Sequence, residues 1–170
     1  MKYEPIVIPK FPKINGIVDM VVAIDISGST VRWFTDVIRE TMKQLLESLI
    51  SSGSFRLTVW SFNHVVQYKT LTEFTDRDYL DFENKINEIL IHGGGGSSYD
   101  ESFYFVKALS LNPSAMVFIT DSVMMEPKNP ADIIANSLEN YVILLHDVTK
   151  ETMLPIPFKS HIIPLLYLHD

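Results

Sequence analysis

The sequence predicts a three-layer α/β fold, and two observations carry this prediction. Short runs of β-branched and apolar residues, such as residues 17–26 (IVDMVVAIDI) and 115–120 (AMVFIT), are typical of strands buried on both faces. Such strands belong to parallel sheets that are covered by helices. These runs also alternate with amphipathic segments at helical spacing, which favours an α/β architecture over separate helical and sheet regions.

The elements follow in order from these patterns. Residues 1–16 contain three prolines and Gly16 and predict an N-terminal arm that is irregular or forms a short edge segment, whereas residues 17–170 form one domain. The other predictions are helices over 31–51, from Thr75, over 98–109 and over 129–138, and strands over 17–26, 55–62, 65–71, 115–120, 141–146 and 161–168. Only Asn63-His64 separates 55–62 from 65–71, which indicates a hairpin, and Pro164 marks the last strand as an edge strand.

Length, charge and cysteine content exclude several classes of protein. The 170 residues suit one domain with one core, and the absence of cysteine excludes disulfide scaffolds, thiolate metal sites and a cysteine nucleophile. Fourteen basic against 21 acidic residues give a formal charge of −7, which repels phosphate backbones and argues against nucleic acid as a ligand. Neither an export signal nor a membrane-spanning run occurs, so we expect a cytoplasmic protein that does not bind a membrane.

Three polar loops stand where strands end or helices begin. They are Asp25–Ser29, the glycine-rich loop Gly93–Ser98, and Thr120-Asp121. In open parallel sheets, ligands bind outside the carboxyl ends of the strands, so these loops converge if their strands are neighbours. Carboxylates and hydroxyls are hard oxygen donors, which favour Mg²⁺, Mn²⁺ or Ca²⁺ over zinc or copper.

These motifs resemble the metal-ion-dependent adhesion site of von Willebrand factor type A (VWA) domains. That site is built from a DxSxS motif, a later threonine and a last aspartate, and the resemblance covers residues 17–168. It implies that Asp25, Ser27, Ser29, Ser97 and Asp121 are the metal ligands. Ser97 stands in place of the threonine, and Ser98 is an alternative to it; Ser122 replaces the usual glycine.

The glycine run and Pro113 before the strand AMVFIT are similar to VWA-like domains joined to predicted metallopeptidases in bacteria and phages. This resemblance implies a doubly wound, mostly parallel VWA/Rossmann-like sheet, with an antiparallel edge strand supplied by the 55–71 hairpin. It also implies a protein partner whose Asp or Glu completes the metal shell. Candidate partners are a MoxR-type AAA+ ATPase or a predicted metallopeptidase.

Three functions remain open at this point. The chain is a non-enzymatic binding module that bridges Mg²⁺ to a partner, a metal-dependent hydrolase or phosphoryl-transfer enzyme that uses Asp25, or a scaffold whose site is empty and whose hydroxyls cap a helix. The sequence places no general base or nucleophile beside the predicted ligands, which favours the binding module over the enzyme.

Overall fold

The computed structural model describes residues 2–63, 72–74, 81–91, 99–121, 129–145, 158–165 and 167–168. Its elements, in chain order, are β1 (Lys2–Tyr3), β2 (Val18–Asp25), α1 (Gly28–Ser52), β3 (Phe55–Phe62), β4 (Thr72–Phe74), α2 (Phe82–Ile91), α3 (Tyr99–Ala108), β5 (Ala115–Thr120), α4 (Asn129–Asn136), β6 (Asn140–Leu144), β7 (His161–Pro164) and β8 (Tyr167–Leu168).

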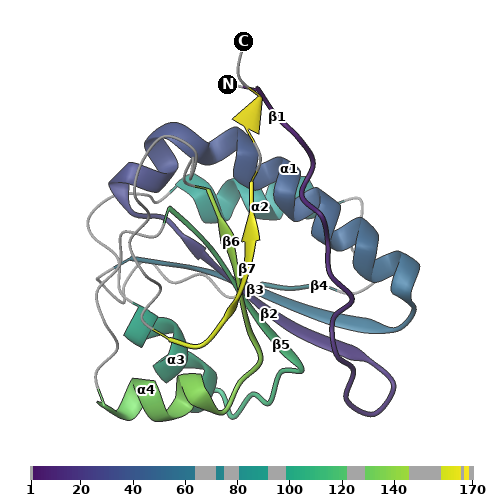
Figure 1. Cartoon of the computed structure of the whole chain (residues 1–170), viewed down its shortest axis with the longest axis vertical. Coiled ribbons are helices and arrows are strands. Elements are labelled where there is room, and N and C mark those ends of the chain that lie inside the picture. Colours follow the sequence, from purple (N-terminus) through teal and green to yellow (C-terminus); the bar gives the residue numbers. More distant parts are fainter. Residues whose placement is uncertain are drawn as a thin grey trace.

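Within these described ranges, the main sheet has six strands in the order β4-β3-β2-β5-β6-β7, of which all but β4 run parallel to one another. Helices α1 and α2 cover one face of this sheet, and α3 and α4 cover the other (Figure 1). The prediction of a three-layer, doubly wound α/β fold is therefore confirmed.

The edge of the sheet beside β3 is formed by β4. Strand β4 pairs antiparallel with β3, and Val59 lies opposite Thr72. The predicted turn at Asn63-His64 lies partly outside the described residues, whose first range ends at Asn63. The predicted strand over 65–71 lies outside the described residues.

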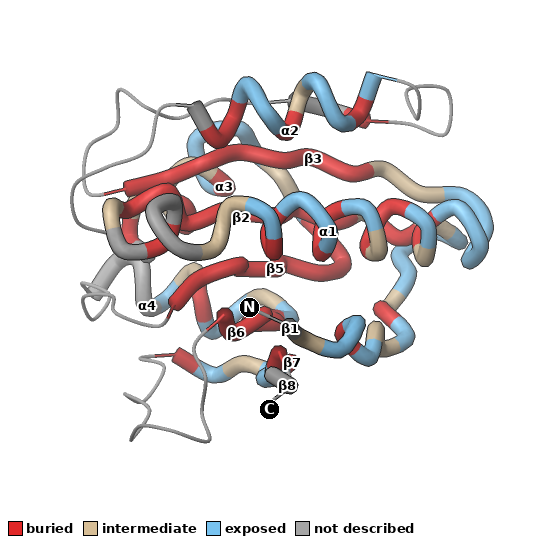
Figure 2. Tube along the Cα trace, turned by 90° about the horizontal axis from the view of Figure 1, so that it is seen from above, coloured by how far each residue is buried: buried red, intermediate tan, exposed pale blue. Residues whose placement is uncertain are grey.

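The sheet is buried on both faces, and alternate residues of each strand enter different clusters. From β2, Val22 and Ile24 pack toward α1 and α2, whereas Val21 and Ala23 pack toward the opposite side. Strands β2, β3, β5 and β6 are accordingly buried along most of their length, whereas only Ile163 of the edge strand β7 is buried (Figure 2). The second cluster is aromatic and includes Trp60, Phe62, Phe103, Phe118 and Phe158.

The order of the strands reverses between β2 and β5. After β2 the chain passes through α1 to β3 on one side, and it later returns to β5 on the other side of β2. The helices that follow β2 and β5 in the chain, α1 and α4, lie on opposite faces of the sheet (Figure 1), and in such open sheets ligands bind at the carboxyl ends of the two strands. Asp25 ends β2 and Asp121 directly follows β5, so both predicted carboxylates lie at this switch point.

The N-terminal arm lies beside β7, at the other end of the main sheet from β4. Strand β1 pairs antiparallel with β8, and the side chains of Ile6 and Phe11 are buried. The ring of Phe11 meets that of Tyr141 edge-on, with 4.9 Å between the ring centroids. Strand β7 is the last strand of the main sheet, in agreement with the edge position that Pro164 predicts.

Candidate metal centre

Asp25 is fully buried, and each of its carboxylate oxygens accepts a hydrogen bond. The backbone N–H of Ser27 donates to Oδ1 over 2.8 Å, and the hydroxyl of Thr120 donates to Oδ2 over 2.8 Å. The first bond is local, because the chain turns from β2 into α1 within two residues. The second joins neighbouring strands and sets the position of the carboxylate relative to β5.

Burial raises the pKa of Asp25 to about 6, because the charged form loses its hydration. The hydrogen bonds from Ser27 and Thr120 act in the opposite direction, and the charge of Asp121 raises the pKa further. The two carboxylates are thus close enough to repel each other. A cation between them would relieve both the repulsion and the lost hydration.

Asp121 is also buried, and it is the first residue after β5. Ile24 and Ile119 lie opposite each other in the parallel register of β2 and β5, so the two strands reach their carboxyl ends together. This register places Asp25 and Asp121 at the same end of two adjacent strands.

Ser27 occupies the N-cap position of α1, yet its side chain makes no capping hydrogen bond to the helix backbone. Its buried hydroxyl instead lies 3.1 Å from the hydroxyl of Thr30 and also bonds to Asp25. The interpretation of Ser27 as only a helix cap therefore does not describe its contacts. The Ser27 hydroxyl therefore lies beside the carboxylate of Asp25, where both groups could bind the same hard cation.

The remaining predicted ligands are described less fully. Ser29 lies in the first turn of α1, but its side chain is outside what the structure describes. Ser97, its alternative Ser98 and the glycine run Gly93–Gly96 lie outside the described residues. Helix α3 begins at Tyr99, directly after that loop.

The sequence analysis missed Thr120 as a partner of Asp25. The available signal is positional: a threonine that ends a buried strand beside the strand that ends in Asp25 can reach across the ladder. That signal requires the pairing of β2 with β5, which the residue pattern alone does not supply.

The residues described at the carboxyl ends of β2 and β5 fit a hard divalent cation. Asp25 and Asp121 supply carboxylates and Ser27 supplies a hydroxyl, which are oxygen donors suited to Mg²⁺. Within the described part of the chain, no group of three or more His, Cys, Asp or Glu side chains gathers to bind a metal. A cation here would therefore depend on two carboxylates supplemented by hydroxyls and water.

No family model and no curated protein matches this chain. Solved structures do match it in fold. The SpRpn10 VWA domain superposes with a TM-score of 0.57 at 11% identity, covering 86% of each chain. Proximal thread matrix protein 1 from the mussel byssus gives 0.56 at 12% identity over 75% of this chain, and the RO (RSR) protein of Deinococcus radiodurans gives 0.56 at 13% over 89%.

These likenesses show that the chain has a VWA-like fold. The chain spans only 36% of the mussel protein and 32% of the Deinococcus protein, whereas its match to the SpRpn10 domain covers most of both chains. None of the helices in the described ranges is both long and apolar enough to cross a membrane.

Proposed function

We propose that this chain is a non-enzymatic protein-binding module that holds one divalent cation and bridges it to an Asp or Glu of a partner protein. The observation that carries the proposal is the buried pair Asp25 and Asp121 at the switch point of a VWA-like sheet. Two carboxylates taken out of water beside each other are costly unless a cation compensates them.

In this proposal Asp25, Ser27 and Asp121 hold the cation, and Ser29 and Ser97 (or Ser98) are proposed as further ligands. Mg²⁺ is the first choice, with Mn²⁺ and Ca²⁺ as alternatives, because all donors are oxygens. A bound cation supplies positive charge and an open position for an anionic oxygen. A chain with a net charge of −7 needs such a cation to attract a carboxylate.

The contacts of Asp25 disfavour the enzymatic alternative. An aspartate that attacks a phosphoryl or carbonyl group must present an oxygen to the substrate. Both oxygens of Asp25 accept hydrogen bonds, from Ser27 and Thr120, and the residue is fully buried. These contacts suit a carboxylate that anchors a cation better than one that attacks a substrate.

The partner is proposed by its chemistry first: a protein surface with an accessible Asp or Glu. Within that class, the resemblance of the motifs nominates a MoxR-type AAA+ ATPase or a predicted metallopeptidase. The proposal includes no contact of this chain with nucleic acid or membrane.

Calorimetric titration with Mg²⁺, Mn²⁺ and Ca²⁺ tests the site. We expect one cation per chain for the unaltered protein and none for Asp121→Asn, whereas Asp36→Asn, an exposed carboxylate on α1, serves as the matched control and binds normally. The candidate partners are then titrated in Mg²⁺ and in EDTA. Equal partner affinity in the two buffers would show that recognition uses another face of the molecule.

A further inference from the structure

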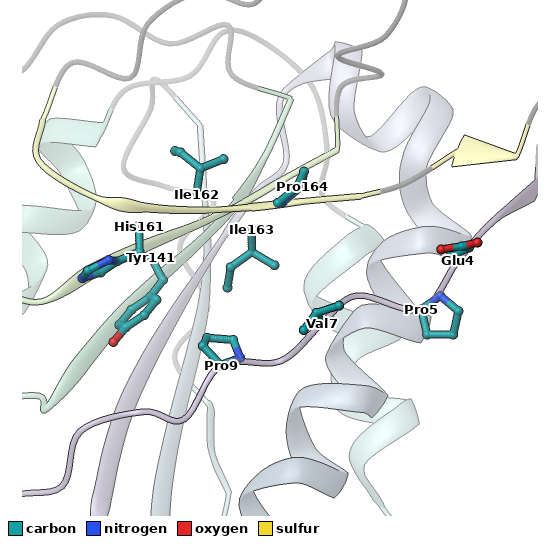
Figure 3. Close-up of a pocket in the computed structure, with 9 residues that line it drawn as sticks. All are labelled: Glu4, Pro5, Val7, Pro9, Tyr141, His161, Ile162, Ile163 and Pro164. Carbon is teal, nitrogen blue, oxygen red and sulfur yellow. The ribbon is translucent and has the colours of Figure 1, made fainter.

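The edge of β7 and the N-terminal arm line a cavity of about 460 Å³, and β6 separates β7 from β5 in the sheet. Its lining comes from the arm, from β6 and from all four residues of β7 (Figure 3). The residues that line it are Glu4, Pro5, Val7, Pro9, Tyr141, His161, Ile162, Ile163 and Pro164. We call this feature the edge groove.

The backbone of β7 has hydrogen-bonding groups that point into the edge groove. Leu165 N–H donates to the carbonyl of Leu144, so this residue faces the neighbouring strand β6. In a parallel ladder alternate residues face the same neighbour, which directs Ile163 to β6 as well and turns Ile162 and Pro164 outward. The outer edge therefore offers one N–H, from Ile162, and the carbonyls of Ile162 and Pro164.

The arm runs along this edge without closing it. The antiparallel register of β1 and β8 pairs Tyr3 with Tyr167, and a continued register would bring residues 4–9 alongside β7. Pro5 and Pro9 lack the N–H that a continuous ladder needs. Among the described strands, none pairs with the outer side of β7. The split between the arm and β7 is the edge groove.

The side chains of the edge groove are mostly apolar in its middle and acidic at one end. Val7 is 82% exposed and Ile162 is 40% exposed, although both are large apolar side chains. Glu4 lies beyond Pro164, at the carboxyl end of β7 (Figure 3). At the other end the rings of His161 and Tyr141 stack with 4.9 Å between their centroids.

We propose that the edge groove binds an extended peptide of a partner protein, which adds a strand to β7. An antiparallel strand is slightly more stable per residue than a parallel one, and it would exchange two hydrogen bonds with Ile162 and donate a third to Pro164. Its side chains alternate between the two faces of the sheet, so apolar side chains on one face cover Ile162 and those on the other face lie toward Val7 (Figure 3). A Lys or Arg near its amino end lies beside Glu4.

The charge of the chain selects this occupant over a second copy of the same chain. Each copy carries a net charge of −7, and two copies paired through β7 would repel each other. A basic peptide is instead attracted both by this net charge and by Glu4. The peptide site is independent of the proposed cation site, so EDTA leaves it unchanged.

A random-peptide library displayed on phage, selected against the purified chain, tests this proposal. We expect enriched peptides with a Lys or Arg followed by a run of apolar residues, because Ile162 and Val7 lie on opposite sides of β7 (Figure 3). Synthetic copies should bind at least tenfold more weakly to Ile162→Pro, which removes the outward N–H, and to Val7→Asp. Pro164 already occupies the equivalent outward position, and Val7 is exposed, so neither change is expected to unfold the chain. Ile133→Asp, an exposed isoleucine of α4, is the matched control and should bind normally.

Two further measurements separate strand addition from simple apolar contact. Two versions of the peptide are each methylated on alternate backbone nitrogens, one on the nitrogens that face β7 and the other on the remaining nitrogens. The first version should lose binding and the second should retain it. Glu4→Lys should shift the selection from basic to acidic residues. The proposal is wrong if no sequence is enriched, if Ile162→Pro and Val7→Asp both bind normally, or if light scattering shows a dimer that Ile162→Pro dissociates.

Discussion

The hydroxyl of Thr120 donates a hydrogen bond of 2.8 Å to Oδ2 of Asp25, and both side chains are fully buried. This bond joins the carboxyl ends of β5 and β2, the two strands between which the sheet reverses its order. The position of Asp25 therefore depends on a neighbouring strand as well as on its own. A residue outside the DxSxS motif takes part in arranging the predicted metal centre.

Thr120→Val should destabilise the cation-free protein and weaken Mg²⁺ binding, whereas Thr120→Ser should preserve both. Valine keeps the shape but removes the donor, which leaves a buried carboxylate oxygen unpaired at a cost of about 1–3 kcal/mol. The lost donor also raises the pKa of Asp25 further, so less of the carboxylate is charged at neutral pH. Chemical unfolding and calorimetry measure the two effects. Identical behaviour of the Val and Ser variants would remove Thr120 from the site.

Asp25→Asn should stabilise the cation-free protein at pH 7. Folding raises the pKa of Asp25 from 3.8 to about 6, so the folded protein holds a proton that the unfolded chain has released between these values. The free energy of unfolding therefore falls as pH rises through this window, by up to about 3 kcal/mol, and the penalty persists above it. Asparagine carries no charge and avoids the penalty.

Unfolding by urea in EDTA, at pH 4 and at pH 7, measures this difference. We expect the advantage of Asp25→Asn over the unaltered protein to grow between the two pH values. Asp25→Ala is the informative comparison, because it leaves the Ser27 N–H and the Thr120 hydroxyl without their acceptor and should be less stable than Asp25→Asn at both. An advantage that does not change with pH contradicts the assignment of the penalty to Asp25.

Mg²⁺ should bind more weakly at acidic pH. A cation and a proton compete for Asp25, whose pKa in the cation-free protein is about 6. The affinity should be nearly constant above that value and fall by up to about tenfold for each pH unit below it, if one proton is displaced. Calorimetry at pH 5, 6 and 7 checks this dependence. A constant affinity over this range would mean that Asp25 does not contact or neutralise the cation.

The sequence predicted the elements that place the carboxylates better than it predicted the contacts between them. The strand expected over 115–120 is the observed β5, and Asp25 and Asp121 lie at strand ends as expected. The strand and the positions of the two carboxylates follow from short apolar runs that each end at an aspartate. The bond from Thr120 depends on which strands are neighbours, and that pairing is a long-range property which periodicity does not encode.

The edge strands show the same limit. Pro164 predicts an edge position for β7 because proline lacks a ladder donor, and this is a local property. The register of β4 against β3 depends instead on the length of the connection between them, and Asn63-His64 carries no turn signal strong enough to fix it. The residue pattern of 1–16 allows a short edge segment, but it does not indicate which edge the arm follows or that a groove lies between the arm and β7.

Trp60 and Ser102 should be energetically coupled across the α3 face of the sheet. The indole N–H of Trp60 donates a hydrogen bond of 3.0 Å to the hydroxyl of Ser102, and both residues are fully buried. Ser102→Ala leaves a buried donor unpaired and should lower the free energy of unfolding by about 1–3 kcal/mol. In a Trp60→Phe background the donor is gone, so the same serine change should cost much less. A double-mutant cycle with urea unfolding measures the coupling, and Ser102→Ala should have its full effect with or without Mg²⁺. Equal costs of Ser102→Ala in the two backgrounds would mean that the Trp60–Ser102 bond does not stabilise the packing of α3 on β3.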